Sequence, residues 1–253
     1  MQIGAQFYTV REQCQTLEGL SESLKKAADI GYRTVQISGT CAYEPEWLRE
    51  ELQKNGLTCA VTHTAADTLA DDTGRVIAGH EIFGCRYIGL GMMPGALHDP
   101  ADYGAFTRRF RPAMEKIRAA GKLFLYHNHQ FEFMRSPGGK IYLERMTEEF
   151  PAGLLGFTFD TYWAQYGGAD PAQWLERLSG RVPCIHVKDM ACVDAAPSMA
   201  PVGEGNLNWS RILAAAEQAG TQYVLVEQDD CHGEDPFDCL RRSYAYLRSL
   251  GLE

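Results

Sequence analysis

The sequence predicts one (β/α)8 barrel, a TIM barrel of the α/β class, formed by residues 1–253. Short runs rich in β-branched and aromatic residues alternate with longer amphipathic stretches along the whole chain, which predicts parallel strands joined by helices. Eight such pairs fit the chain at about 31 residues each, and this number favours closure into a barrel. An open doubly wound sheet also fits the alternation, but no glycine-rich phosphate loop follows the first strand. No Pro/Gly/Ser-rich linker divides the chain, so we expect a single domain.

The strand predictions come from short apolar runs that end at polar or turn-forming residues. The run Tyr223-Val-Leu-Val, for example, has the composition of a strand buried on both faces. The predicted strands are residues 2–8, 34–38, 58–63, 87–91, 123–129, 154–160, 182–188 and 223–229.

The helix predictions come from apolar residues at helical spacing, such as Leu17, Leu20 and Leu24. Asp170 followed by Pro171 is typical of an N-cap with proline at the first helical position. Glycines at positions 31, 56, 121 and 220 are expected to end helices before the next strand. The predicted helices are residues 17–30, 44–55, 72–84, 101–120, 141–150, 171–179, 208–219 and 236–249.

The bulk composition argues against nucleic-acid and membrane partners. The formal net charge is −9, whereas a nucleic-acid groove needs a basic stripe. No apolar run approaches the roughly 20 residues of a membrane span, and residues 1–8 lack the basic and apolar regions of a signal peptide. The eight cysteines show no CxxC spacing, so we expect reduced thiols in a cytoplasmic protein.

Polar side chains end four successive predicted strands on one face. Side chains alternate along a strand, so residues two apart point the same way. The residues in phase are Leu125 with His127 and His129, Thr158 with Asp160, Cys184 with His186 and Lys188, and Leu225 with Glu227 and Asp229. A barrel gathers the C-terminal ends of its strands at one mouth, where active sites form. We therefore expect these polar side chains to lie close together.

The residue types in this set indicate a site for one divalent transition metal. Imidazole and carboxylate ligands suit Mn²⁺, Zn²⁺, Co²⁺ or Fe²⁺, whereas Mg²⁺ favours oxygen ligands alone. Taken singly, the residues have structural explanations, since a strand-end histidine is commonly hydrogen-bonded and Asp160 could form a turn or cap. Glu227 is harder to explain in this way, because a carboxylate ending a buried strand is costly unless it is paired or metal-bound. The coincidence over four strands favours the metal.

The sequence resembles the xylose isomerase-like barrel superfamily, the group of sugar phosphate isomerases and epimerases that is related to the inosose dehydratases. The resemblance rests on the segments YHNHQFEF at 126–133, FDTYW at 159–163, HVKDM at 186–190, VEQD at 226–229, GEGN at 203–206 and QFYTVR at 6–11. It therefore extends over nearly the whole chain, and its motifs are more specific for the superfamily than for a substrate.

The resemblance implies a metal set of Glu, Asp, His and Glu from strands 5 to 8. Asp160, His186 and Glu227 match the last three members, while histidine replaces the glutamate of strand 5. The spacing leaves both His127 and His129 open as the strand-5 ligand. We assign the metal to His127 and keep His129 as a catalytic candidate.

We expect a divalent-metal-dependent sugar isomerase or epimerase that abstracts a proton next to a carbonyl and forms an enediolate. Glu227 is the expected general base, and Lys188 would hold the enediolate charge. Related epimerases pair the strand-5 and strand-8 glutamates as acid and base; here that pair is incomplete, and Glu132 is the candidate second carboxylate. The expected substrate is a small sugar or polyol, with an unphosphorylated one slightly preferred. Candidate substrate-binding residues are His63, Trp163, Gln6 and Glu204.

Three alternatives remain open. A metal-dependent dehydratase or lyase on a keto-sugar, keto-inositol or keto-glycoside would expel a β-substituent from the same enediolate. The superfamily also contains DNA-repair endonucleases, but these need further metal ligands, and the net charge of −9 opposes DNA binding. A non-catalytic sugar-binding barrel would have no need of the metal set. Because related barrels are often dimers or tetramers, a homo-oligomer is possible.

Overall fold

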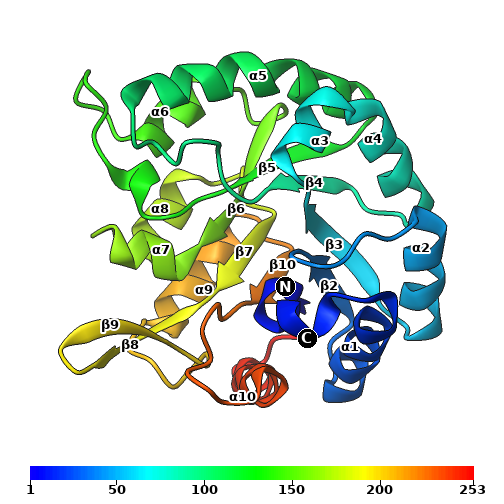
Figure 1. Cartoon of the computed structure of the whole chain (residues 1–253). Coiled ribbons are helices and arrows are strands. Elements are labelled where there is room, and N and C mark those ends of the chain that lie inside the picture. The colour runs from blue at the N-terminus through cyan, green and yellow to red at the C-terminus, as the bar shows by residue number, and fades with distance from the viewer.

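Eight parallel strands close into a barrel in the computed structural model, which describes residues 1–253 (Figure 1). Each strand pairs with its successor around the ring, and the last pairs with the first. The barrel strands are β1 (Gln2–Gln6), β2 (Thr34–Ile37), β3 (Thr58–His63), β4 (Tyr87–Leu90), β5 (Leu123–His127), β6 (Leu155–Asp160), β7 (Cys184–Val187) and β10 (Tyr223–Val226). This confirms the (β/α)8 barrel predicted from the sequence.

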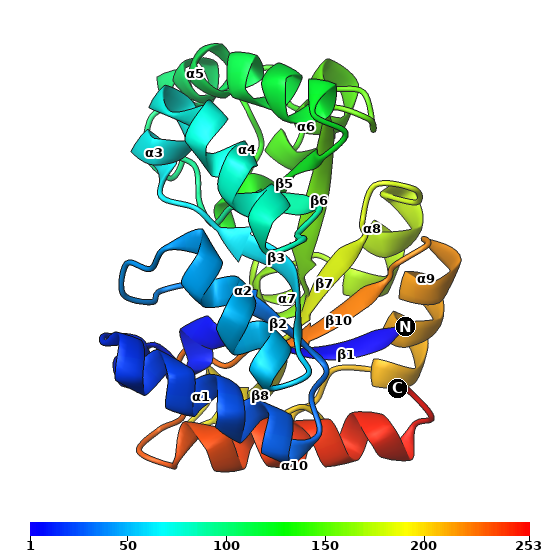
Figure 2. The ribbon, with the colours of Figure 1, turned by 90° about the vertical axis from the view of Figure 1, so that its right-hand side faces the viewer.

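Helices surround the strands on the outside of the barrel (Figure 2). All eight predicted helices are present, with ends shifted by at most two residues. They are α1 (Leu17–Ile30), α2 (Pro45–Lys54), α4 (Thr73–Ile82), α5 (Pro100–Ala119), α6 (Tyr142–Glu149), α8 (Pro171–Arg177), α9 (Trp209–Gln218) and α10 (Pro236–Ser249). No helix combines the length and the apolar character needed to cross a membrane.

Six elements of three to eight residues were not predicted from the sequence, and the first of them takes up the last two residues of the predicted strand 2–8. The helical ones are η1 (Phe7–Cys14), α3 (Ala66–Asp71), η2 (Phe131–Phe133) and α7 (Thr161–Tyr166). The other two, β8 (Asp189–Val193) and β9 (Ala196–Ala200), form an antiparallel hairpin outside the barrel sheet. Its turn residues Asp194 and Ala195 both have positive φ, without the glycine that normally marks such a turn.

The helix ends follow the predicted capping chemistry. The Asp170 carboxylate accepts the backbone N–H groups of Ala172 and Gln173 at 3.0 and 3.2 Å, and Pro171 begins α8. Gly31 ends α1 at a φ of +126°, which L side chains rarely adopt. These ends set where the chain leaves each helix for the next strand.

The buried apolar residues form two separate clusters. The larger one, of 57 buried residues, contains the side chains between strands and helices, whereas only six residues form the cluster inside the barrel. The inner residues are Ala60, Val61, Tyr87, Leu125, Cys184 and Leu225. Continuing three of these strands by two residues gives His127, His186 and Glu227, so a polar layer follows this apolar layer toward the C-terminal ends of the strands.

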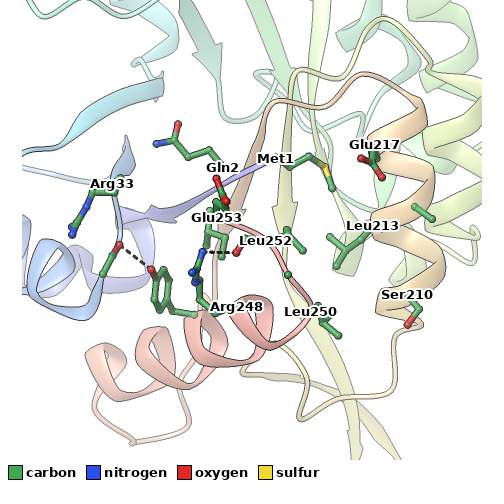
Figure 3. Close-up of a pocket in the computed structure, with 15 residues that line it drawn as sticks. Met1, Gln2, Arg33, Ser210, Leu213, Glu217, Arg248, Leu250, Leu252 and Glu253 are labelled. Carbon is green, nitrogen blue, oxygen red and sulfur yellow. Dashed lines mark hydrogen bonds between the residues drawn. The ribbon is translucent and has the colours of Figure 1, made fainter.

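The opposite end of the barrel, at the N-terminal ends of the strands, carries a separate cavity of about 1060 Å³ (Figure 3). The chain terminus borders it: the Ile3 N–H donates to the Glu253 carbonyl at 2.6 Å, and Arg248 donates to the Leu252 carbonyl at 2.7 Å. These contacts connect the last residues of the chain to the first strand.

Gly89 of β4 is a position where the barrel has no room for a side chain. A Cβ atom there would lie 2.3 Å from the Thr62 carbonyl oxygen of the neighbouring strand. We expect Gly89→Ala to lower the free energy of unfolding by about 1–3 kcal/mol, because the backbone must move to relieve the overlap. Urea denaturation measures the change. Gly138→Ala, where no atom lies within 4 Å, is the control; equal stabilities of the two variants would contradict the prediction.

Candidate metal centre and active site

Four side chains converge at the C-terminal mouth of the barrel. His127 ends β5, Asp160 ends β6, His186 lies in β7, and Glu227 directly follows β10. All four are buried, and one potential ligand atom from each lies within 4.8 Å of all the others. These are the four residues predicted from the sequence to bind the metal. The cluster could hold a metal ion.

Each histidine of the cluster is oriented by a hydrogen bond through one ring nitrogen. His127 Nδ1 lies 2.9 Å from the Gly91 carbonyl oxygen, which can only accept, so this nitrogen donates and Nε2 faces Asp160 Oδ2. His186 Nε2 lies 2.7 Å from Gln36 Oε1, which leaves Nδ1 free. Metal-binding histidines commonly have such a partner on their second nitrogen.

Each carboxylate of the cluster is likewise held through one oxygen. Asp160 Oδ1 accepts the Trp163 backbone N–H at 2.8 Å, and Glu227 Oε1 accepts the Gln6 side-chain amide at 2.7 Å. The second oxygen of each carboxylate points to the centre of the cluster. Asp160 Oδ2 lies 3.4 Å from His127 Nε2, and Glu227 Oε2 lies 2.8 Å from His186 Nδ1.

The free atoms fit a metal better than they fit one another. His186 Nδ1 and Glu227 Oε2 are fully buried, yet neither has a hydrogen bond of acceptable geometry despite their close approach. Donor atoms of a tetrahedral site with bonds of about 2.1 Å lie about 3.4 Å apart, and the three spacings measured within the cluster are 2.8, 3.4 and 3.6 Å. Two nitrogens and two carboxylate oxygens also form a suitable donor set for a transition metal.

Lys188 is a buried cation beside the cluster. Its Nζ lies 2.8 Å from Glu227 Oε2, 3.3 Å from Asp160 Oδ2 and 2.9 Å from both oxygens of Asp229. Burial alone would lower the pKa of Lys188, but the three carboxylates raise it above its ordinary value. Lys188 is therefore charged, and Asp229 is its one carboxylate partner that does not belong to the cluster of four.

The same charges determine the ionisation of the cluster. Burial alone would raise the pKa values of Asp160 and Glu227, yet Lys188 and the neighbouring histidines hold both below their ordinary values. Burial opposes the charged form of His186 as well, but Glu227 and Asp160 raise its pKa to about 9. Both carboxylates are thus ionised, and without a metal the His186 ring is positively charged.

Two further histidines lie beside the cluster but outside it. Burial lowers the pKa of His129 to about 3 and holds the pKa of His63 well below its ordinary value, so both rings are neutral. His63 Nδ1 contacts Ser38 Oγ at 3.1 Å, and its Nε2 has no partner. His129 stacks on Phe131 at a centroid distance of 5.3 Å, and its Nδ1 also has no partner. Each ring therefore presents a free nitrogen.

A cavity of about 1220 Å³ opens at this mouth. His63, His129, Trp163 and Lys188 line it together with His127 and Glu227 of the cluster, and Tyr8 and Asp229 also contribute. No role was predicted for Asp229 or Gln36, although both are in phase with inward-facing residues of their strands.

Three other candidate residues do not line this cavity. Gln6 is fully buried and contacts Glu227, as described above. Glu204 lies at the surface, where it pairs with Arg242 at 3.0 Å. Glu132 is fully buried and accepts the His129 backbone N–H at 2.8 Å; its other oxygen is hydrogen-bonded to the Tyr126 hydroxyl.

The chain belongs to the xylose isomerase-like TIM barrel family, whose sequence profile matches residues 24–250. A sugar phosphate isomerase/epimerase from Parabacteroides distasonis ATCC 8503 superposes with a TM-score of 0.82 and 22% identity, over 98% of this chain and 93% of that one. An L-ribulose 3-epimerase superposes with a TM-score of 0.76 and 14% identity, over 100% and 95% of the two chains. The inosose dehydratase of Geobacillus kaustophilus strain HTA426 is 23% identical over 192 residues, which cover 66% of this chain and 61% of that protein. The proteins to which this chain is similar thus include isomerases or epimerases and a dehydratase.

The buried Glu132 predicts a pH-dependent stability. Burial raises its pKa to about 8 from an ordinary value of 4.5, so the folded chain keeps this proton at pH 7 while the unfolded chain releases it. The stability contributed by Glu132 is therefore complete below pH 4.5 and falls as the pH rises toward 8, by on the order of 3 kcal/mol at pH 7.

Glu132→Gln removes this titration while keeping groups able to bond Tyr126 and His129. We expect the stability of the wild type, relative to that of the variant, to fall between pH 5 and pH 8 in urea denaturation. Parallel pH profiles of the two proteins would show that Glu132 is already ionised in the fold.

Proposed function

We propose that this protein is a divalent-metal-dependent sugar isomerase or epimerase that abstracts a proton next to a carbonyl group. The observation that carries the proposal is the arrangement of His127, Asp160, His186 and Glu227. Each side chain is held by the protein through one polar atom and presents its other polar atom to a common centre. The isomerase/epimerase neighbour described above supports the reaction class.

A divalent transition metal held by these four residues would act as a Lewis acid and stabilise negative charge developing on a substrate oxygen. Mn²⁺, Zn²⁺, Co²⁺ and Fe²⁺ suit the donor set better than Mg²⁺.

Glu227 is the proposed general base. It lines the cavity, it is ionised, and Gln6 occupies only one of the two lone-pair sites on Oε1. Lys188, also in the cavity wall, places a positive charge where the enediolate forms. It remains protonated, because three carboxylates surround it.

The other wall of the site is assigned to aromatic residues. Neutral His129 presents a free nitrogen and is the proposed second acid/base group, while His63 hydrogen-bonds a substrate hydroxyl. Trp163 forms an apolar surface for a sugar face, with Lys188 Nζ 5.5 Å from its ring centroid. Glu132 acts through its bond to the His129 backbone, since it does not line the cavity itself.

A dehydratase or lyase reaction is the second candidate. Strand β5 ends in histidine rather than glutamate, so two carboxylates cannot serve as the acid/base pair of an epimerase. The likeness to an inosose dehydratase points the same way. In that reaction the enediolate expels a β-substituent, and the proton that Glu227 took from carbon passes to the leaving oxygen, which His129 and His63 could hydrogen-bond from the cavity wall.

Metal content tests the proposed centre. We expect close to one transition-metal ion per chain after loading with Mn²⁺, Co²⁺ or Zn²⁺, and loss of the metal in His186→Ala and Asp160→Asn, because each removes a donor atom. Atomic absorption of the dialysed proteins measures this.

Matched controls are His232→Ala and Asp194→Asn, which change exposed residues outside the cluster and should retain the metal. Gln36→Leu should weaken metal binding by about 10- to 100-fold, since it removes the partner of His186. A wild type that holds no metal under any of these loadings would refute the centre.

A panel of aldoses, ketoses and keto-inositols in deuterated water tests the reaction. Solvent deuterium at the carbon next to the carbonyl, with an isomer or epimer as product, supports the first candidate, whereas loss of water supports the second. Glu227→Gln should slow the exchange by at least about 100-fold, because it removes the base. If the metal-loaded protein exchanges no deuterium with any member of the panel, the proposed chemistry is wrong.

A further inference from the structure

The cavity at the barrel mouth extends well beyond the metal-ligand cluster. Its volume of about 1220 Å³ exceeds the roughly 300–1,000 Å³ that is typical for a drug-sized ligand. A single sugar ring would therefore leave much of it empty. One end is formed by the polar cluster. The other end, which we call the apolar arm, is lined by Tyr43, Pro45, Ala66, Val76, Ile82 and Phe83.

The residues that line the apolar arm come from the segment that follows β2 and from the helices α3 and α4. These two helices lie side by side around the barrel (Figures 1 and 2). Tyr43, Ala66 and Phe83 pack against the hydrophobic core on one side but are only partly buried. The arm is bounded by tight packing, because a Cβ atom on Gly79 of α4 would lie 3.2 Å from Pro45. Its walls are therefore apolar surfaces on well-packed elements.

The charges around the cavity disfavour an anionic group in the arm. Only two cationic side chains line the cavity, and both have carboxylate partners. Lys188 is surrounded by carboxylates, and Arg75 lies 3.0 Å from Asp72. Glu44 and Glu46 add negative charge beside the arm. A phosphate would find no unpaired cation there, whereas an apolar group would replace water along apolar walls.

We propose that the substrate is a keto-sugar that carries an apolar substituent, such as the aryl group of a keto-glycoside, so that a carbonyl remains available at the polar end. The sugar lies at the polar end beside His127 and Glu227, and the substituent lies in the apolar arm. This inference rests on the proposed function for the position of the sugar, and it adds the class of the second group.

Equilibrium binding to the Mn²⁺-loaded protein tests the proposal. The probes are the methyl and phenyl β-glycosides of glucose and of galactose, together with cellobiose, each measured by titration calorimetry. We expect the phenyl glycoside of at least one sugar to bind about 10- to 100-fold more tightly than its methyl counterpart, because the ring is removed from water in the arm.

Two substitutions fill the arm and one matched substitution does not. Ala66→Phe and Ala78→Phe add a ring at cavity-lining positions, the second on the exposed side of α4, where folding is not at risk. Ala105→Phe makes the same change at an exposed position of α5 that lines neither large cavity. The preference for phenyl over methyl should fall by about tenfold in the arm variants and stay unchanged in the control.

Equal binding of the two glycosides, an unchanged preference in both arm variants, or no binding of any probe would overturn the inference. Tighter binding of cellobiose than of the phenyl glycosides would assign the arm to a second sugar instead. These outcomes are distinct from failure of the proposed function. If the metal and the deuterium exchange are absent but the phenyl preference depends on the arm, the binding inference stands and the enzyme assignment falls.

Discussion

The burial of opposite charges at the barrel mouth is the constraint on which the rest of the site depends. Asp160, Glu227 and Asp229 surround Lys188, whose side chain is only 1% exposed. Charges removed from water are stable only when they are paired and when their remaining lone pairs are bonded. The fold therefore supplies a hydrogen-bond partner for one polar atom of each residue in the cluster.

Two of the partners come from neighbouring strands, β1 and β2. Gln6 of β1 and Gln36 of β2 are opposite each other in the strand register, and both are fully buried. Gln6 orients Glu227 and Gln36 orients His186, so two neighbouring strands determine which atoms of these ligands remain free. The pairing of β1 with β2 thus places two glutamines so that they orient Glu227 and His186 before any ion binds.

The sequence predicts that the side chains of the cluster point into the barrel, because side chains alternate along a strand whatever its neighbours are. Alternation cannot separate His127 from His129, which share a phase. The structure separates them because β5 ends at His127 and the chain turns into η2, where Glu132 bonds the His129 backbone. The role of Gln6 was equally unreadable, since its partner Glu227 is 221 positions away in the sequence. Surface pairing of Glu204 with Arg242 likewise depends on tertiary contacts.

Charge balance gives a physical reason for histidine at the end of β5. The three carboxylates that surround Lys188 exceed its charge by two, which equals the charge of one divalent cation. A glutamate in place of His127 would add a fourth carboxylate and leave the buried site negative, at a cost that rises in low dielectric. The histidine on β5 and the Lys188–Asp229 pair are therefore parts of one arrangement. The resemblance implies a glutamate at the end of β5. The histidine found there keeps the total charge of this polar layer lower.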